Sequence, residues 1–309
     1  MPVVGWSGRD CNRDINMDEE LDFSSTAPKP IPKAPVPPAP PAARSPLYNP
    51  QVALAFFRGA AKLEEVGGGK TFFVENEKSG GFFSKGERMY LLLEGEIGLM
   101  AKGAFVGLIR PGEIFGEMAL LAKAPRLATA VAKVACKALA LDEKSFQAAL
   151  QKTPEFALMM MGVMVNRLRQ NMARKGAGAV SVTGEVTEKH DVFNKKQLAS
   201  IADELAPMVI PAGKAIMHTG DIGIFMYIVQ EGHVAISMQS KIVERVGPGG
   251  VFGEMAMVDN SSRAANATAE TDCSLIMVKR TDFLDLVKSK PEFGMSILRT
   301  IAERIHALA

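Results

Sequence analysis

The sequence is poor in the residues that most often build disulfide frameworks and metal centres. Its 309 residues include three cysteines and four histidines. Three cysteines cannot form a disulfide framework, and their scarcity is typical of a reducing compartment. The histidines are scattered along the chain, whereas a metal centre on a β-roll would need them clustered. We therefore expect no metal site and no bound cofactor. The residues concerned are Cys11, Cys136, Cys273, His190, His218, His233 and His306.

Long apolar runs and an excess of charge are also missing. The most apolar run, Phe156–Val165, is too short for the roughly 18 residues of a membrane span. The first twenty residues hold no apolar stretch of signal-peptide length. The net charge of +2 lacks the basic excess of an electrostatic nucleic-acid binder. We expect a cytoplasmic protein with no membrane span that does not bind DNA.

Proline, by contrast, is concentrated near the N-terminus. The segment Ala27–Ala43 reads APKPIPKAPVPPAPPAA, which can form neither a helix nor a sheet ladder. Residues 1–45 are therefore predicted to be a disordered, Pro-rich tail. Two functions stay open for it: a stiff extended linker, or a docking peptide for an aromatic-lined groove of a partner.

A five-residue motif occurs twice in the rest of the chain. Phe-Gly-Glu-Met-Ala lies within Gly112–Ala130 and again within Gly249–Ala267, each time with an Arg nine residues after the Glu. The two copies are 137 residues apart, and further pairs keep the same offset. Those pairs are Tyr90 and Tyr227, Gly95 and Gly232, Cys136 and Cys273, and Pro154 and Pro291. A constant offset over so long a stretch indicates an internal duplication.

Each copy follows one order of elements: a leading helix, several short strands separated by glycines, then two closing helices. In the first copy we expect a helix over Gln51–Glu65 and closing helices over Asp142–Gln151 and Thr153–Lys175. This order predicts an α+β fold with two tandem β-rolls of jelly-roll type. The predicted domains are residues 46–175 and 190–309, joined by a linker over 176–189.

The repeated motif has the chemistry of an anion site. A short helix that starts at Gly-Glu offers free backbone N–H groups at its N-terminal end, and its dipole favours negative charge. Arg126 and Arg263 can present a planar guanidinium to phosphate oxygens. Glu117 and Glu254 would repel a phosphate, but they could accept a hydrogen bond from a ribose hydroxyl. One alternative stays open: the Glu and Arg pair with each other in a vestigial site.

The motif with its downstream Arg resembles the phosphate-binding cassette of cyclic nucleotide-binding domains. That family includes the catabolite gene activator, regulatory subunits of cyclic-AMP-dependent kinase, and gated ion channels. The upstream stretches GERMYLLLEGEIGL and IFMYIVQEGHVAIS resemble its strand-turn-strand signature. The resemblance covers residues 48–174 and 190–308, and it implies cyclic AMP or cyclic GMP as the ligand.

By this resemblance, the Glu binds the ribose 2′-hydroxyl, the Arg pairs with the cyclic phosphate, and neighbouring backbone completes the cradle. The implied binding residues are Gly116, Glu117, Met118, Ala119, Arg126, Leu127, Gly253, Glu254, Met255, Ala256, Arg263 and Ala264. The sequence departs from the family at Leu127, Ser262 and Asn266. Leu127 adds bulk where Ala264 leaves room, so we predict that the second site binds cyclic AMP more tightly.

We expect a cyclic nucleotide sensor without catalytic activity, in which ligand binding moves the C-terminal helices and so regulates a partner. The alternatives are a kinase regulatory subunit and a scaffold with degenerate sites. The chain shows no helix-turn-helix after its last helix, which argues against a DNA-binding regulator. The effector could bind the Pro-rich tail or the closing helices, and a homodimer stays open. The Met-rich helix expected over Thr153–Lys175 is apolar on nearly all of its faces. This pattern predicts that the helix contacts more than its own domain.

Overall fold

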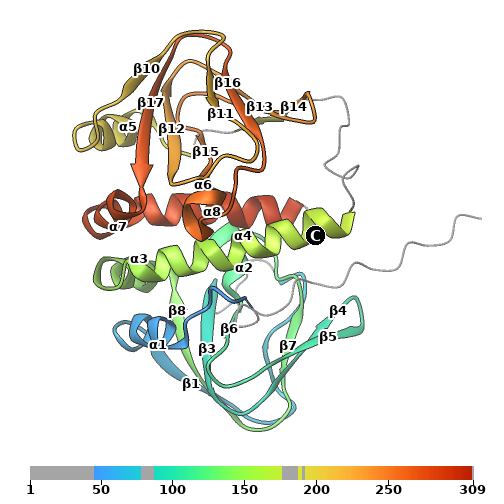
Figure 1. Ribbon diagram of the computed structural model, residues 1–309. Coiled ribbons are helices and arrows are strands. Elements are labelled where there is room, and N and C mark those ends of the chain that lie inside the picture. The colour runs from blue at the N-terminus through green and yellow to red at the C-terminus, as the bar shows by residue number, and fades with distance from the viewer. Residues whose placement is uncertain (1–44, 78–86, 176–186, 190–191, 308–309) are drawn as a thin grey trace, which may run out of the picture. The chain divides into compact units, whose positions relative to one another are not determined.

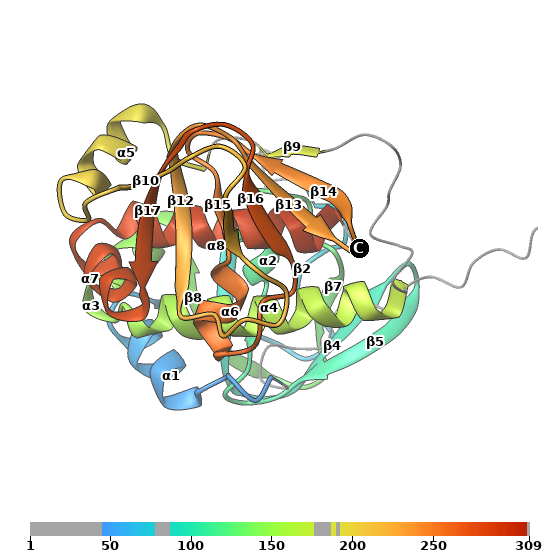
Figure 2. The same ribbon diagram turned by 45° about the horizontal axis from the view of Figure 1, so that its top comes forward.

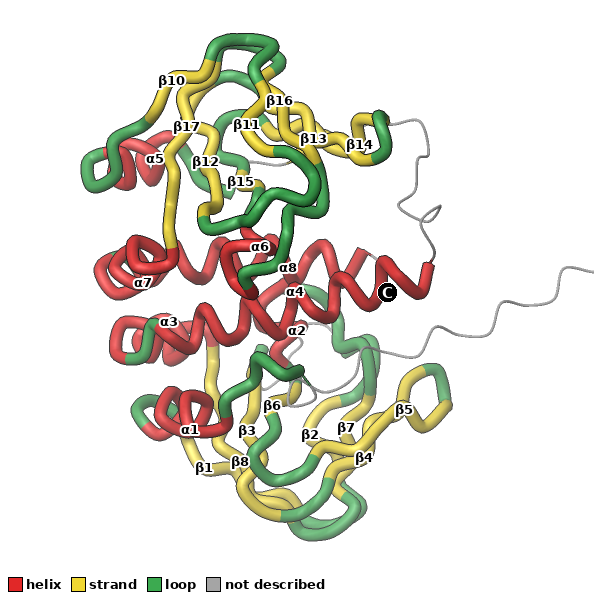
Figure 3. The backbone as a smooth tube through the Cα atoms, in the orientation of Figure 1, coloured by secondary structure: helices red, strands yellow, loops and turns green. Residues whose placement is uncertain are grey.

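The computed structural model describes residues 45–77, 87–175, 187–189 and 192–307. Two β-rolls follow each other along the chain, each built from two mainly antiparallel sheets and accompanied by helices (Figure 1). Figure 3 separates the strands of each roll from the helices that precede and follow it. The predicted α+β class with tandem β-roll domains is confirmed. The predicted tail over residues 1–45 lies almost entirely outside the described residues, and the predicted domain boundaries stay predictions.

The first domain begins with α1, whose start is fixed by Asn49. The Asn49 side chain accepts hydrogen bonds from the backbone of Gln51 and Val52, and Pro50 occupies the first turn. Two sheets follow, in the strand orders β1-β8-β3-β6 and β2-β7-β4-β5. The elements are α1 (Pro50–Arg58), β1 (Lys62–Val66), β2 (Thr71–Phe73), β3 (Arg88–Glu94), β4 (Ile97–Ala101), β5 (Ala104–Ile109), β6 (Ile114–Phe115), α2 (Glu117–Ala122), β7 (Thr129–Ala132), β8 (Cys136–Asp142), α3 (Glu143–Lys152) and α4 (Glu155–Lys175).

The second domain repeats this plan. Asn194 and Gln197 form a reciprocal capping box at the start of its leading helix, α5. The sheets have the orders β10-β17-β12-β15 and β11-β16-β13-β14-β9. The elements are β9 (Thr187–Lys189), α5 (Lys195–Ala202), β10 (Met208–Ile210), β11 (Ala215–Met217), β12 (Phe225–Glu231), β13 (Val234–Met238), β14 (Lys241–Val246), β15 (Val251–Phe252), α6 (Glu254–Asp259), β16 (Asn266–Ala269), β17 (Cys273–Lys279), α7 (Arg280–Ser289) and α8 (Pro291–Ala307).

Two predicted segments differ from the structure. The helix expected over Gln51–Glu65 ends at Arg58, and Lys62–Val66 is strand β1, antiparallel to β8. The segment 176–189, interpreted as linker, contains β9, which pairs in parallel with β14 at the edge of the second roll (Figure 2). Both strands are short and fixed by pairing with distant strands, which no local pattern reveals.

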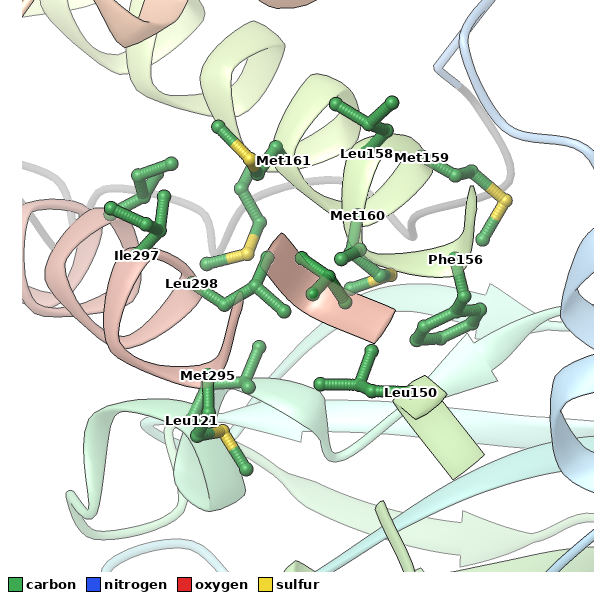
Figure 4. Close-up of a cluster of buried hydrophobic side chains, with 14 of the residues drawn as sticks. Leu121, Leu150, Phe156, Leu158, Met159, Met160, Met161, Met295, Ile297 and Leu298 are labelled. Atoms are coloured by element: carbon green, nitrogen blue, oxygen red, sulfur yellow. The ribbon is translucent and has the colours of Figure 1, made fainter. Parts of the chain in front are cut away.

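The described residues form a hydrophobic core of three parts. One cluster fills each β-roll, and a third, larger cluster is built mainly from the helices of both domains. In this third cluster Met160 and Met161 of α4 lie close to Ile297 and Leu298 of α8, as Figure 4 shows. The prediction that α4 packs against more than its own domain is therefore confirmed.

Candidate functional site

Each Phe-Gly-Glu-Met-Ala motif, together with the Arg nine residues after its Glu, is called a cassette below. The first cassette begins at the junction of β6 and α2. Gly116 has a left-handed backbone (φ 76°), and a Cβ built there would lie 2.9 Å from a guanidinium nitrogen of Arg126. Only glycine satisfies both conditions. Arg126 donates from Nη1 to the Gly116 carbonyl oxygen at 2.8 Å, and its guanidinium lies 4.1 Å from the centre of the Phe73 ring. The cassette Arg is thus held between a carbonyl and an aromatic face.

The second cassette repeats this geometry. Gly253 also has φ 76°, and Arg263 donates to its carbonyl oxygen at 2.7 Å. Arg263 makes a further hydrogen bond to the Phe225 carbonyl oxygen at 2.7 Å. Its guanidinium lies 5.6 Å from the centre of the Tyr227 ring, a looser approach than in the first domain. The two sites share one plan but differ in how the Arg is held.

Each cassette Glu is bound by an Arg from the closing helix of its own domain. Arg167 of α4 forms an ion pair with Glu117, and the two side chains are only 7% and 6% exposed. Arg304 of α8 pairs in the same way with Glu254 and also donates to Glu244 at 3.2 Å. The structure therefore gives the Glu and the cassette Arg separate partners, unlike the alternative in which they neutralise each other.

Burial and nearby carboxylates shift the pKa values of the arginines at these sites in opposite directions. Burial lowers the pKa of Arg126, although the Tyr90 phenol and the Glu77 carboxylate oppose this shift. Burial likewise lowers the pKa of Arg263. For Arg304, burial also acts to lower the pKa, but the carboxylates of Glu254 and Glu244 outweigh it and raise the pKa. Both cassette arginines are thus buried cations, which favours a nearby anion.

The structure brings the remaining predicted residues to the same two places. Ala119 and Ala256 are buried in the cassette helices, and Met118 and Met255 are partly buried beside them. After the cassette Arg, Leu127 is partly buried whereas Ala264 is exposed. Each predicted set therefore lies together at one cassette.

Two features of the sites were missed from sequence. Arg167 and Arg304 have the same 137-residue offset as the cassettes, which could have revealed them. Gly223, in the loop before β12, lies against the second cassette, since a Cβ there would be 2.1 Å from the Ala256 Cβ. Backbone hydrogen bonds from Arg263 to Asp221 and from Gly220 to Arg263 fix this loop to the cassette.

The closing helices also contact the cassette region of the other domain. Arg299 of α8 donates to the Leu121 carbonyl oxygen at the end of α2 (3.4 Å) and to Glu143 (2.9 Å). In return, Arg169 of α4 forms an ion pair with Asp259 at the end of α6 and also hydrogen-bonds Ser261. Both helices thus touch both cassettes.

Over the described residues, no group of three or more His, Cys, Asp or Glu side chains is arranged to hold a metal ion. No helix in the described part of the chain is long and apolar enough to cross a membrane.

A family model for the cyclic nucleotide-binding domain matches residues 81–153 and 207–290, just over half of the chain. The chain belongs to this family. The cAMP-dependent protein kinase regulatory subunit of Schizosaccharomyces pombe is 30% identical over 204 residues, 63% of this chain and 45% of that protein. A cyclic nucleotide-gated potassium channel of Rhizobium etli is 36% identical over 107 residues, 35% of this chain and 30% of that protein. The chain therefore spans less than half the length of these two relatives.

Among solved structures, the regulatory domain of Toxoplasma gondii PKA with cAMP is 22% identical. That match covers 75% of this chain and 85% of the other, with a TM-score of 0.28. The Thermus thermophilus catabolite activator protein is 27% identical over 37% of this chain and 56% of the other, with a TM-score of 0.34. Both TM-scores are low, so membership of the cyclic nucleotide-binding family rests on the matched sequence.

Proposed function

We propose that this cyclic nucleotide-binding chain is a non-enzymatic sensor of cyclic AMP that regulates a partner protein. The observation that supports the proposal is the same arrangement of four residues in both domains. In each domain a left-handed Gly, a buried Glu, a cassette Arg and an Arg from the closing helix occur at the same spacing. A structural ion pair alone would not need the left-handed Gly or the second Arg.

The two charges of each cassette suit a cyclic nucleotide. Arg126 and Arg263 are fixed by hydrogen bonds to neutral carbonyl oxygens, so their positive charge can meet the single negative charge of a cyclic phosphate. Glu117 and Glu254 are buried and each pairs with an Arg of a closing helix, and a paired carboxylate can still accept a hydrogen bond from the ribose 2′-hydroxyl.

Regulation would pass through α4 and α8. Each helix binds its own cassette Glu and also contacts the cassette helix of the other domain. A ligand that competes with the closing-helix Arg for the cassette Glu would weaken the packing of that helix, and a ligand that strengthens the ion pair would favour it. The result is a population shift between two packings of the Met-rich helical core.

The proposal is tested by thermal unfolding with cyclic AMP, cyclic GMP or neither, together with an assay for AMP. A ligand present at 1,000 times its Kd should stabilise the fold by about 4 kcal/mol. We expect a clear rise in melting temperature and no AMP. A melting temperature that neither nucleotide raises at millimolar concentration would contradict binding. AMP formed in proportion to protein would contradict the non-enzymatic assignment.

A second candidate is a regulatory subunit of a protein kinase, favoured by the similarity to the S. pombe regulatory subunit over 63% of this chain. It predicts that the purified chain retains a kinase from cell extract, and that cyclic AMP releases the kinase. A scaffold with degenerate sites predicts binding of neither nucleotide. The location in the cytoplasm, and an effector site on the Pro-rich tail or the closing helices, stay predictions.

A further inference from the structure

The two β-rolls differ at one edge. Strands β5 and β14 are equivalent, because they are 137 residues apart and each forms a hairpin with the strand before it. The outer side of β14 pairs in parallel with β9, so that sheet has five strands. β5 is the last strand of its sheet, and among the described residues nothing pairs with its outer side. Figures 1 and 3 show the β4–β5 hairpin at the rim of the first roll.

The open edge has the composition of a covered one. β5 reads Ala-Phe-Val-Gly-Leu-Ile, without charge or proline, and Phe105 is 58% exposed. The covered strand β14 reads Lys-Ile-Val-Glu-Arg-Val and carries three charges. Proteins protect open edge strands with charges, prolines or a covering segment. β5 has neither charge nor proline, so its sequence favours a covering segment.

The duplication indicates which segment corresponds to β9. Lys189, the last residue of β9, lies five residues before Asn194, the cap of α5. Arg44 lies five residues before Asn49, the cap of α1. Residues 42–44, Ala-Ala-Arg, are thus the counterpart of β9 and lie outside the described residues. Pro41 precedes them and has no N–H, which limits a strand there to the three residues that β9 also has.

The chain enters both domains at equivalent places. The backbone N–H groups of Val192 and Phe193 donate to the Gly249 carbonyl oxygen, both at 3.1 Å. In the first domain the Tyr48 phenol donates to the carbonyl oxygen of Gly112, the equivalent glycine, at 2.7 Å. Each glycine lies in the turn that follows β14 or β5. The described chain before α1 is therefore fixed close to the end of β5.

We propose that residues 42–44 add to β5 as a parallel edge strand, in the register that β9 has on β14. Arg245 lies opposite Glu188 in that register, so the equivalent Leu108 would lie opposite Ala43. This strand covers the apolar edge and holds the base of the tail against the first roll. The Pro-rich segment then starts from a fixed place on the domain. The inference does not depend on nucleotide binding.

The test is disulfide formation within the full chain. Cys11→Ser removes the cysteine of the tail, while Cys136 and Cys273 are only 2% exposed. Into this chain Ala43→Cys is introduced together with Leu108→Cys. Adjacent strands lie about 4.8 Å apart, within the roughly 4.4–6.8 Å between Cα atoms that a disulfide spans. We expect rapid formation of a disulfide within one chain.

The matched control pairs Ala43→Cys with Thr71→Cys, because Thr71 is exposed on β2, at the opposite edge of the same sheet. This pair should form its disulfide slowly. Equal rates for the two pairs, or no disulfide in either, would overturn the inference. A disulfide between two chains carrying Leu108→Cys alone would also overturn it, because a second copy would then cover β5.

Hydrogen exchange supplies a measurement that needs no added cysteine. Ala42→Pro with Ala43→Pro removes two backbone N–H groups from the proposed strand. The amides of residues 104–109 should then exchange about tenfold faster or more than in the parent, because their outer side loses its pairing. The amides of β2 should not change. Unchanged exchange over residues 104–109 would contradict the pairing.

Discussion

Arg167 and Glu117 form an ion pair, 50 residues apart in sequence, that joins the closing helix α4 to the first residue of α2. Arg304 and Glu254 repeat the pair at the same separation in the second domain. The carboxylate proposed to bind ribose is therefore already bound by the helix proposed to move. Occupancy of the site and the position of the helix become linked through one side chain.

Loss of Arg167 should destabilise the folded chain. In Arg167→Ala the Glu117 carboxylate stays buried without its partner, which typically costs about 3–5 kcal/mol. Urea unfolding of both proteins measures this difference, and Glu117→Gln in the same chain should recover part of it. The control is Lys133→Ala, which breaks an exposed pair with Glu96 and should cost less than about 1 kcal/mol. Equal costs for the two substitutions would contradict the buried pairing.

The two cassette arginines should separate the two binding events. Arg126→Ala and Arg263→Ala each remove a charge-assisted contact worth about 1.5–3 kcal/mol, which weakens one site by about tenfold or more. We predict that Arg263→Ala weakens the tighter event, because Leu127 would add bulk to the first site where the smaller Ala264 would leave room in the second. The ranking is wrong if Arg126→Ala abolishes the tighter event and Arg263→Ala leaves it unchanged.

Gly95 should be irreplaceable for steric reasons. Its φ is 98°, and a Cβ there would lie 2.5 Å from the Cys136 sulfur and 2.7 Å from the Ala135 carbonyl oxygen. Gly103 also has a left-handed backbone (φ 76°) but nothing within 4 Å. Gly95→Ala should therefore cost more than Gly103→Ala by about 1–3 kcal/mol of overpacking. Similar melting temperatures for the two variants would contradict the packing at the β3–β4 turn.

The sequence predicted the duplication, the β-rolls and the cassette residues because these depend on local patterns and a constant offset. It missed β1, which continues a helical pattern through Leu63 yet pairs with β8. The 137-residue offset marks Arg167 and Arg304 as an equivalent pair, but the partner of Arg167, Glu117, lies in another element and is joined to it only by three-dimensional packing. The contacts of Arg299 with Leu121 and Glu143 cross between domains and leave no sequence signal.

Stability at alkaline pH should depend on Tyr90. Burial, with a smaller contribution from the Glu64 carboxylate, raises the pKa of its phenol from 10.0 to about 12. The unfolded phenol ionises first, so this contribution to stability is complete below pH 10 and is lost as the pH rises towards about 12. Urea unfolding at pH 9 and pH 11.5 should show about 2 kcal/mol less loss for Tyr90→Phe than for the parent. Equal losses of stability for the parent and for Tyr90→Phe would contradict the burial of the Tyr90 phenol.

The central claim is that this chain holds two cyclic nucleotide sites built on Arg126 and Arg263. Calorimetry of the parent chain and of the Arg126→Ala, Arg263→Ala double variant with cyclic AMP tests it most directly. The control is Arg245→Ala, which removes a surface pair with Glu270. We predict two ligands per chain for the parent and the control, and for the double variant binding at both sites that is weaker by about tenfold or more. Binding by the double variant that matches the parent, or no binding by the parent at millimolar nucleotide, would contradict the claim.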